Sequence, residues 1–451
     1  MLTLKYLTEI FPEYKGNLLD ENCEVNLMMD SREKVNHGLF IPIIGERFDA
    51  HQFIEQAIEN GAVAALWDRT KTIPSTAPDS FIFLLVDNTT EALQKLAKQY
   101  REDVNPIVIG ITGSNGKTTT KDIVSSVVKK KYRTHHTEGN FNNEIGMPIT
   151  ILRMKKNTEV LVVEMGMSDF GEIDLLTKIA QPDFAIITNI GESHIEYLGS
   201  REGIAKAKLE IKNGLKDDGK LLIDGDEPLL EQCKNDHNVV AIGFESENDV
   251  KVENVEYVKQ MTTFIINEKK YELPILGKHH AKNAAFAIKI GENLGLTYEQ
   301  ILSGLKSVQQ TNMRFEWLTG KNGVALINDA YNASPTSMKA AIEVLKQISG
   351  YKQKIVVLGD ILELGKYNET FHRSVGNEIN SPIDIVYTYG EGSRFISQEI
   401  IDQGKNIISI HFDDKNELIK KLEEHCNEET IILFKASRGM KFEQFVESLL
   451  E

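Results

Sequence analysis

One segment, PIVIGITGSNGKTTTKDIVSSVVKK at residues 106 to 130, constrains the fold more than any other part of the chain. An unbroken apolar run predicts a buried strand, a glycine-bearing loop follows at once, and an amphipathic pattern then predicts a helix. Such a loop lets backbone N–H groups crowd around phosphate oxygens, and the helix N-terminus adds partial positive charge. We therefore expect a nucleotide-phosphate site formed by Gly113, Ser114, Asn115, Gly116, Lys117, Thr118 and Thr119.

Two side chains of this loop have specific predicted roles. Lys117 is placed to reach the terminal phosphates, and the hydroxyl of Thr118 is placed to ligate Mg²⁺. The general motif GxxxxGK[ST] would put its first glycine at Ile111, whereas this chain has Gly113. The alternative interpretation is a strand-to-helix turn with incidental glycines, which the strand, loop and helix context disfavours.

The pattern along the chain predicts an α/β protein of three domains, as the 451 residues also indicate at roughly 150 residues per domain. Residues 1–102 predict a small mixed α/β domain that ends at the charged, linker-like segment REDVNP (101–106). Residues 103–312 alternate apolar strands with helices, which is typical of a parallel sheet covered on both faces. Short alternating segments at 239–275 predict a small antiparallel annex to that domain, and residues 313–451 predict a second, Rossmann-like α/β domain.

Charge and cysteine usage exclude several classes of protein. Lysine and arginine total 51 against 67 aspartates and glutamates, a formal charge of −16, which disfavours nucleic-acid and anionic-membrane binding. The longest apolar runs are strand-sized, so no membrane insertion is expected. Cys23, Cys233 and Cys426 form no CxxC pair, which favours a reducing, cytoplasmic location.

Three further residues are candidates for metal chemistry. Glu164 ends the apolar run VLVVE and His194 follows FAIITNI, so a parallel sheet would bring both to the edge that carries the phosphate loop. Taken alone, the glutamate is equally well read as a solvated residue at a turn, and the histidine is more often one. Lys208 falls on the apolar stripe of its predicted helix, with Ile204 and Ile211, where a lysine either reaches out to solvent or has a partner.

The loop variant TGxNGKTT resembles that of the Mur ligase superfamily of ATP-dependent amide ligases, which includes the folylpolyglutamate synthases. The resemblance implies ATP and Mg²⁺, with Thr118, Glu164, His194 and a carbamylated Lys208 holding the metal. It implies catalytic roles for Lys117, His194, Lys208 and Arg314. ATP would also be bound by Asn283, Arg314 and Asp329, the last two at the entrance to the third domain.

One family motif is met only in part. The pattern GxHNxxNxxAA is matched by Gly277, His279, Asn283 and Ala284, but His280 stands where the first asparagine is expected. The amide of Asn283 can pair with an adenine edge, whereas His280 offers only part of what an asparagine would. Capping of a helix start is the alternative role for both residues.

Within the superfamily, four segments resemble the members that join D-alanyl-D-alanine to UDP-N-acetylmuramoyl-tripeptide in peptidoglycan synthesis, on which cell shape and division depend. They are DSREKVNHGLFIPIIGERFDAHQFIEQAIENGA (30–62), GNFNNEIGMPITIL (139–152), NDAYNASPTSM (328–338) and GDILELG (359–365). The resemblance implies an acyl-phosphate intermediate, substrate contacts at Ser31, Arg32 and Asn140, and a monomeric enzyme. Lys435 and Arg438 are candidates for the dipeptide carboxylate, with surface charge as the alternative.

Three other functions remain open at this point. One is a related ligase that adds another amino acid, although the DNPR string of the diaminopimelate-adding members is absent. A folylpolyglutamate synthase would not be expected to carry the DSR-type first domain. A nucleotide switch or assembly ATPase is the third, because a phosphate loop alone supports binding or hydrolysis equally well, but the NKxD string of a GTPase is missing. The third residue of the tripeptide is not readable from the sequence.

Overall fold

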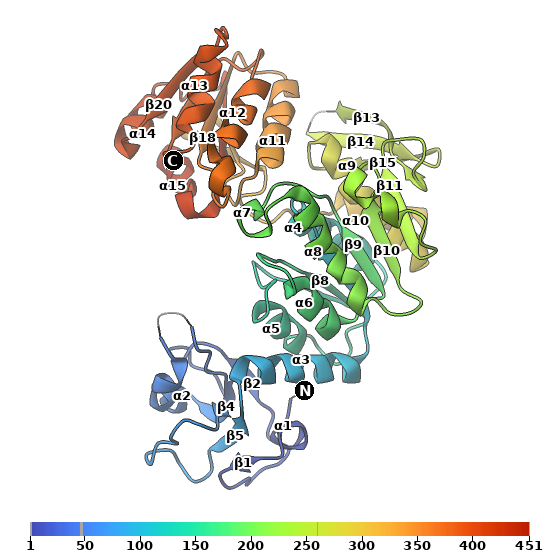
Figure 1. Ribbon diagram of the computed structural model, residues 1–451, viewed down its shortest axis with the longest axis vertical. Coiled ribbons are helices and arrows are strands. Elements are labelled where there is room, and N and C mark those ends of the chain that lie inside the picture. The colour runs from blue at the N-terminus through green and yellow to red at the C-terminus, as the bar shows by residue number, and fades with distance from the viewer. Residues whose placement is uncertain (1, 46–47, 259, 451) are drawn as a thin grey trace.

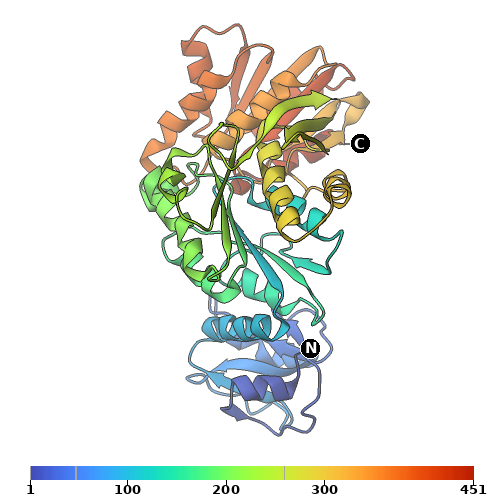
Figure 2. The same ribbon diagram turned by 90° about the vertical axis from the view of Figure 1, so that its right-hand side faces the viewer.

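The computed structural model describes residues 2–45, 48–258 and 260–450, and it consists of three α/β units arranged along the long axis of the molecule (Figure 1). The first unit lies at one end, the second in the middle, and the third at the other end (Figure 2). This arrangement confirms the predicted fold class. The boundaries near residues 103 and 313 stay predictions. Residues 46 and 47 of the segment 30–62 lie outside the described residues.

The first unit is built on a five-stranded sheet of order β1-β5-β4-β3-β2, in which only β1 runs antiparallel to its neighbour. The three central strands of the sheet are apolar runs, as strands covered on both faces are. Its elements are α1 (Leu4–Ile10), β1 (Tyr14–Lys15), β2 (Asn26–Met28), β3 (Gly38–Phe40), η1 (Ala50–Phe53), α2 (Ile54–Glu59), β4 (Ala62–Asp68) and β5 (Ile82–Val86).

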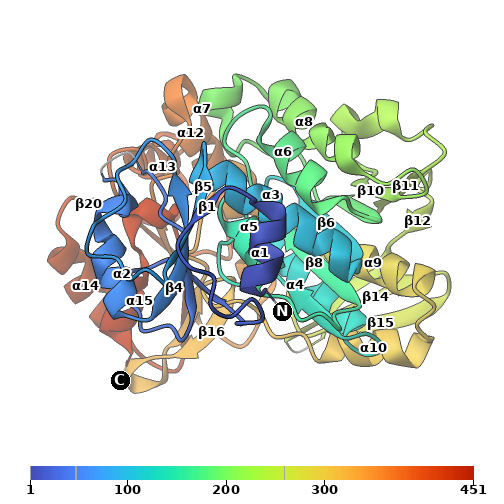
Figure 3. The same ribbon diagram turned by 90° about the horizontal axis from the view of Figure 1, so that it is seen from below.

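Helix α3 (Thr89–Val104) joins the first unit to the second and contacts both (Figure 3). Thr89 Oγ1 at its start donates to the carbonyl of Pro42, and Tyr100 Oη near its end donates to the carbonyl of Met154. Arg101 is buried and its Nε donates to the carbonyl of Ile179. The segment 101–106, expected as a linker, is therefore helical through residue 104. Its arginine is buried and hydrogen-bonded, whereas Glu102 and Asp103 are exposed.

The second unit is a seven-stranded, fully parallel sheet of order β12-β11-β10-β9-β6-β8-β7. Strand β6, which precedes the glycine-bearing loop, lies between β9 and β8, so the loop opens at the centre of the carboxyl edge. The elements are β6 (Ile107–Thr112), α4 (Lys117–Val128), β7 (Thr134–His136), α5 (Gly146–Leu152), β8 (Val160–Glu164), α6 (Glu172–Ala180), β9 (Phe184–Ile187), α7 (Ile195–Leu198), α8 (Arg201–Leu209), η2 (Glu210–Gly214), β10 (Lys220–Asp224), η3 (Pro228–Cys233), β11 (Val239–Gly243) and β12 (Val250–Lys251).

The antiparallel annex is smaller than expected. It consists of β13 (Glu253–Val258), β14 (Met261–Ile266) and β15 (Lys269–Leu273), followed by α9 (Lys278–Asn293) and α10 (Tyr298–Lys306). Residues 239–251, predicted to belong to it, instead extend the parallel sheet as β11 and β12. The prediction was wrong there because strands this short look alike in sequence whichever sheet they join.

The third unit is a six-stranded sheet of order β16-β17-β21-β18-β19-β20, parallel except for β16 at the edge. Its elements are β16 (Glu316–Thr319), η4 (Lys321–Gly323), β17 (Ala325–Asn328), α11 (Pro335–Gln347), β18 (Gln353–Gly359), η5 (Gly365–Tyr367), α12 (Asn368–Glu378), β19 (Ile385–Tyr389), α13 (Arg394–Asp402), β20 (Ile408–Phe412), α14 (Lys415–Glu423), β21 (Thr430–Lys435), η6 (Arg438–Met440) and α15 (Glu443–Leu449). Among the helices of the described residues, none has the length and hydrophobicity needed to span a bilayer.

Candidate active site

The loop between β6 and α4 has the backbone of a phosphate cradle. Gly113 and Gly116 adopt φ values of +149° and +78°, which are strained for any residue with a Cβ. A Cβ on Gly113 would lie 1.8 Å from Thr188 Oγ1, and one on Gly116 would lie 3.1 Å from Asn283 Nδ2. The glycines are therefore required by the close approach of Thr188, which follows β9, and of Asn283 on α9, as well as by conformation.

Lys117 folds back over this loop. Its Nζ donates to the carbonyl of Gly113 at 2.8 Å. Desolvation lowers the pKa of Lys117, and the nearby Arg314 lowers it further against the opposing effect of Glu164. Two cations facing one cradle indicate a ligand with more than one negative charge, as a nucleoside triphosphate has.

Thr118 and Glu164 are brought together as the parallel topology predicts. Glu164 ends β8 opposite Ile111 of β6, and Thr118 Oγ1 donates to Glu164 Oε2 at 2.9 Å. The other carboxylate oxygen, Oε1, accepts from Asn142 Nδ2 at 2.8 Å. A hydroxyl and a carboxylate beside a phosphate loop are oxygen ligands that suit Mg²⁺.

His194 lies at the N-terminus of α7 and contacts the third unit. Its Nδ1 is 2.6 Å from Glu363 Oε2, although the ring N–H does not point straight along that line. The contact with His194 holds the pKa of Glu363 below its usual range, against the effect of desolvation. No cluster of three or more histidine, cysteine or acidic side chains suited to a metal occurs among the described residues. The predicted metal ligands Glu164 and His194 therefore need Thr118 and Lys208 to complete the site.

Lys208 is the most unusual buried residue of the second unit. It is 2% exposed, and within the described part of the chain no carboxylate lies within ion-pair distance of its Nζ. Desolvation, with a further contribution from Lys117, lowers the pKa of Lys208 well below its usual value. Lys208 therefore neither reaches solvent nor has an acidic partner among the described residues, and its burial disfavours the charged form of the amine. Its role and its carbamylation stay predictions.

The third unit contributes a cation and an ion pair to the same region. Arg314 Nη2 is 3.4 Å from Thr118 Oγ1, and its guanidinium stacks 4.1 Å from the ring centroid of Tyr331. Asp329 Oδ2 accepts from Lys435 Nζ at 2.6 Å. Lys435, a candidate for the dipeptide carboxylate, is thus already paired, and its pKa is lowered by desolvation against the effect of Asp329.

The motif on α9 faces the loop from the other side. Asn283 is buried beside Gly116, and its Nδ2 lies 3.4 Å from Nδ1 of His280. Burial lowers the pKa of His279 to about 4 and that of His280 well below its usual value. Both imidazoles are therefore neutral at physiological pH, and Nδ1 of His280 faces the amide of Asn283.

The phosphate loop, the motif on α9 and the residues of the third unit enclose one cavity of about 400 Å³. Glu164, His194 and Lys208 do not line it. It is lined by the loop residues 114–119, by Asn283, His279 and His280, and by Arg314, Asp329 and Lys435. Ser114 Oγ, Asn115 Nδ2 and Arg314 Nε are buried without hydrogen-bond partners. Unpaired buried polar atoms are costly in a finished interior, so they indicate a polar ligand, and the set fits a nucleoside triphosphate with Mg²⁺.

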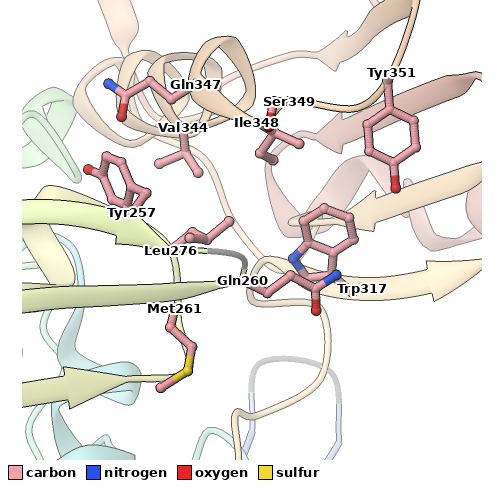
Figure 4. Close-up of a pocket in the computed structure, with 10 residues that line it drawn as sticks. All are labelled: Tyr257, Gln260, Met261, Leu276, Trp317, Val344, Gln347, Ile348, Ser349 and Tyr351. Atoms are coloured by element: carbon pink, nitrogen blue, oxygen red, sulfur yellow. The ribbon is translucent and has the colours of Figure 1, made fainter.

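A second cavity between the annex and the third unit has different chemistry (Figure 4). Its volume is about 590 Å³, and its lining is formed by Tyr257, Gln260, Met261, Leu276, Trp317, Val344, Gln347, Ile348, Ser349 and Tyr351. None of these side chains is charged. The larger cavity therefore lacks the groups that phosphoryl chemistry needs.

The remaining predicted substrate contacts lie apart from the loop. Ser31 is buried and its Oγ donates to Gln56, whereas Arg32 is exposed and pairs with Asp30. Asn140 is exposed on the loop after β7. Arg438 is exposed and pairs with Glu443 at 3.0 Å. The roles assigned to these residues, and to the other site residues, stay predictions.

Several residues at the site have no motif that would have revealed them. Thr336 Oγ1 donates to Glu192, and Ser334 Oγ donates to Asn115 Oδ1 at 2.9 Å, so the N-terminus of α11 is docked on the phosphate loop. Asn142 is a third example. Ser334 and Asn142 lie inside the segments 328–338 and 139–152 that carry the family resemblance, which was the only available signal.

Models of three Mur ligase domains match consecutive parts of the chain: the Mur ligase family catalytic domain at residues 26–101, the middle domain at 111–291, and the glutamate ligase domain at 313–438. The UDP-N-acetylmuramoyl-tripeptide–D-alanyl-D-alanine ligase of Bacillus subtilis is 47% identical over 100% of this chain and 98% of its own length. The chain belongs to the Mur ligase family.

Solved structures agree with this assignment to the Mur ligases. MurF of Acinetobacter baumannii superposes with a TM-score of 0.87 at 30% identity, covering 99% of this chain and 98% of the other. MurF of Thermotoga maritima, solved in complex with ADP, gives 0.83 at 31% identity, with 93% and 96% covered. A folylpolyglutamate synthase of Thermotoga maritima gives 0.56 at 16% identity, which shows a shared fold alone.

Proposed function

We propose that this Mur ligase joins D-alanyl-D-alanine to UDP-N-acetylmuramoyl-tripeptide at the expense of ATP. The observation that carries the proposal is the cavity in which the phosphate loop of the second unit faces Arg314 of the third, with Glu164 hydrogen-bonded to Thr118 of that loop. The identity of 47% to the Bacillus subtilis ligase, over the full length of the chain, supports the choice of substrates.

The reaction has two steps, phosphoryl transfer and then amide formation. A carboxylate oxygen of the tripeptide attacks the γ-phosphorus of ATP, and the bond to the β,γ-bridging oxygen breaks, which gives an acyl phosphate and ADP. The free amine of the dipeptide then attacks the acyl carbon and loses a proton. The C–O bond to phosphate breaks, so that an amide and inorganic phosphate leave the site.

The residues of this chain act mainly by positioning and charge. Lys117 and Arg314 offset the repulsion between the carboxylate and the phosphate, which is the main obstacle to the first step. Thr118 and Glu164 would hold Mg²⁺, with His194 and Lys208 as the other predicted ligands. When bound, Mg²⁺ supplies Lewis-acid polarisation of the phosphoryl oxygens.

Lys208 suits the carbamate that the family resemblance implies. A neutral amine adds to CO₂, whereas a charged ammonium does not, and burial keeps the pKa of this lysine low. The product would be an anion in place of a base. That anion would lie near Lys117, whose positive charge it would partly offset.

The three units divide the remaining work. We assign UDP-sugar binding to residues 1–102 through Ser31 and Arg32, and dipeptide binding to residues 313–451, with Asn140 contacting substrate from the second unit. We also propose that the enzyme is a cytoplasmic monomer that binds no nucleic acid. The three cysteines, all free thiols, support a reducing compartment.

Phosphate release from ATP tests the proposal. It is measured with both acceptors, with each acceptor alone, and with neither, and turnover is expected only when both are present. Lys117→Met should abolish turnover, and Lys130→Met, which changes an exposed lysine after the same helix, should not. ATP turnover that is independent of the two acceptors would contradict the ligase function and favour a switch or assembly ATPase.

A further inference from the structure

The contact between His194 and Glu363 crosses from the second unit to the third (Figure 1, where α7 lies against the third unit). The two atoms, Nδ1 and Oε2, are 2.6 Å apart, which is too close for a bare ring nitrogen to face a carboxylate oxygen. The short separation favours the tautomer that carries its proton on Nδ1, on the side of the carboxylate, although this N–H is not aligned with the line between the two atoms. That tautomer leaves the lone pair on Nε2, which is the atom that could bind a metal.

Both residues have strained backbones. His194 has φ +65° and Glu363 has φ +61°, the left-handed region that residues with a Cβ rarely adopt. Such strain persists only where the surroundings enforce it, and it gathers at functional sites. The strain at both residues therefore indicates that the contact between His194 and Glu363 has a functional role.

The surrounding backbone holds the same two segments together. Glu196 N donates to the carbonyl of Glu363 at 3.3 Å, and Tyr367 Oη donates to the carbonyl of Gly199 at 3.5 Å. Gly365 packs so closely that a Cβ there would lie 3.2 Å from Cγ of Glu196. Residues 363–367 therefore pack against the start of α7, next to His194, and form hydrogen bonds with it.

We propose that Glu363 is the positioning residue of His194, and this rests on the function proposed above. Its carboxylate fixes the tautomer and the rotation of the imidazole, as second partners of metal-binding histidines do. Because the carboxylate comes from the third unit, His194 is held in its working state only while the second and third units are in contact. The GDILELG segment thereby couples domain contact to completion of the metal site.

The experiment compares the wild type with Glu363→Ala, with Glu363→Gln as a second variant should the first not fold. Mn²⁺ binding in the presence of ADP is followed by electron paramagnetic resonance, and kcat and KM for ATP are measured in the acceptor-dependent assay. The matched control is Glu391→Ala, an exposed glutamate of the same unit. We expect Glu363→Ala to weaken Mn²⁺ binding and lower kcat by about 10- to 100-fold, with an unchanged KM for ATP and an unchanged melting temperature.

A double-mutant cycle with His194→Ala tests whether Glu363 affects Mn²⁺ binding and kcat through His194. Glu363→Ala should add no further loss when His194 is already absent, because it acts through that ring. Wild-type Mn²⁺ affinity and kcat in Glu363→Ala, or an equal loss in the His194→Ala background, would overturn the proposal. If the wild type itself showed no acceptor-dependent turnover, the proposed function would fail instead, and the Mn²⁺ titration would still test the pairing.

Discussion

Asp329 and Lys435 form an ion pair at the carboxyl ends of two neighbouring strands, with Oδ2 and Nζ 2.6 Å apart. The side chains are 14% and 3% exposed, respectively, and β17 and β21 pair in register immediately before them. Lys435 Nζ also donates to the carbonyl of Asn332 at 3.1 Å. The pair thus fixes the floor of the cavity on the side of the third unit.

Removing one member of this pair should be strongly destabilising. Lys435→Ala leaves the carboxylate of Asp329 buried without its counter-ion, and we expect a loss of about 3–5 kcal/mol in the free energy of unfolding. Lys352→Ala is the control, because it breaks an exposed ion pair with Glu429 and should cost less than about 1 kcal/mol. Urea unfolding of both variants measures the difference, and equal small losses would contradict the burial argument.

Lys208→Ala should abolish ligation, because it removes the amine that would carry the carbamate. The protein should stay folded, because alanine suits a buried helix position. Short carboxylates added to this variant should restore part of the activity by replacing the carbamate. Lys206→Ala, on the exposed face of the same helix α8, should stay active. The measurement is acceptor-dependent phosphate release. Full activity of Lys208→Ala would remove the carbamate from the mechanism.

His136 should make the protein less stable in mild acid. Burial, with Lys129 and Lys121 nearby, lowers its pKa from 6.5 to about 4. As the pH falls between these two values, the unfolded chain takes up a proton that the folded chain does not, so stability falls. We expect His136→Gln to lose about 2 kcal/mol less than the wild type between about pH 7.5 and pH 5.

Denaturant midpoints at the two pH values measure this difference. The exposed His237 offers a control, since His237→Gln should follow the wild type. A His136→Gln variant with the pH dependence of the wild type would show that the imidazole is protonated in the folded state.

Gly113→Ala should be far more damaging than Gly171→Ala, although both glycines have positive φ. A Cβ on Gly171 meets nothing within 4 Å, so only the backbone strain of about 1 kcal/mol is expected. A Cβ on Gly113 would displace the hydroxyl of Thr188, which donates to the carbonyl of Asn115 at 2.6 Å. Unfolding and ATP-binding titrations should show loss of both properties in Gly113→Ala alone.

Those parts of the fold and site that follow from strand order could be predicted from the sequence. Glu164 lies beside Thr118 because one ends β8 and the other follows β6, and adjacent parallel strands share an edge. Helical periodicity likewise placed Lys208 on the apolar face of α8, although it left open whether the amine reaches solvent.

The partners supplied by another domain could not be predicted. Glu363 opposite His194 and Ser334 on Asn115 depend on how the third unit is oriented, and no local pattern encodes that orientation. The pairing of Lys435 with Asp329 was missed because the two lie 106 positions apart in the chain. A lysine near a strand end looks the same whether it is free or paired.

Helix α3 has a consequence for the thermodynamics of closure. Because its two ends are anchored in different sheets, through Thr89 and Tyr100, the first two units are joined by packed backbone. The other joint, near Met313 and Phe315, has two positive φ values and no such helix. When the ligands are brought together, conformational entropy is therefore lost at the joint between the second and third units, and not at the joint formed by α3. Under the proposed division of substrates among the units, the UDP-sugar and ATP would meet at a high effective concentration set by the packed joint, whereas the dipeptide would be delivered by movement of the third unit.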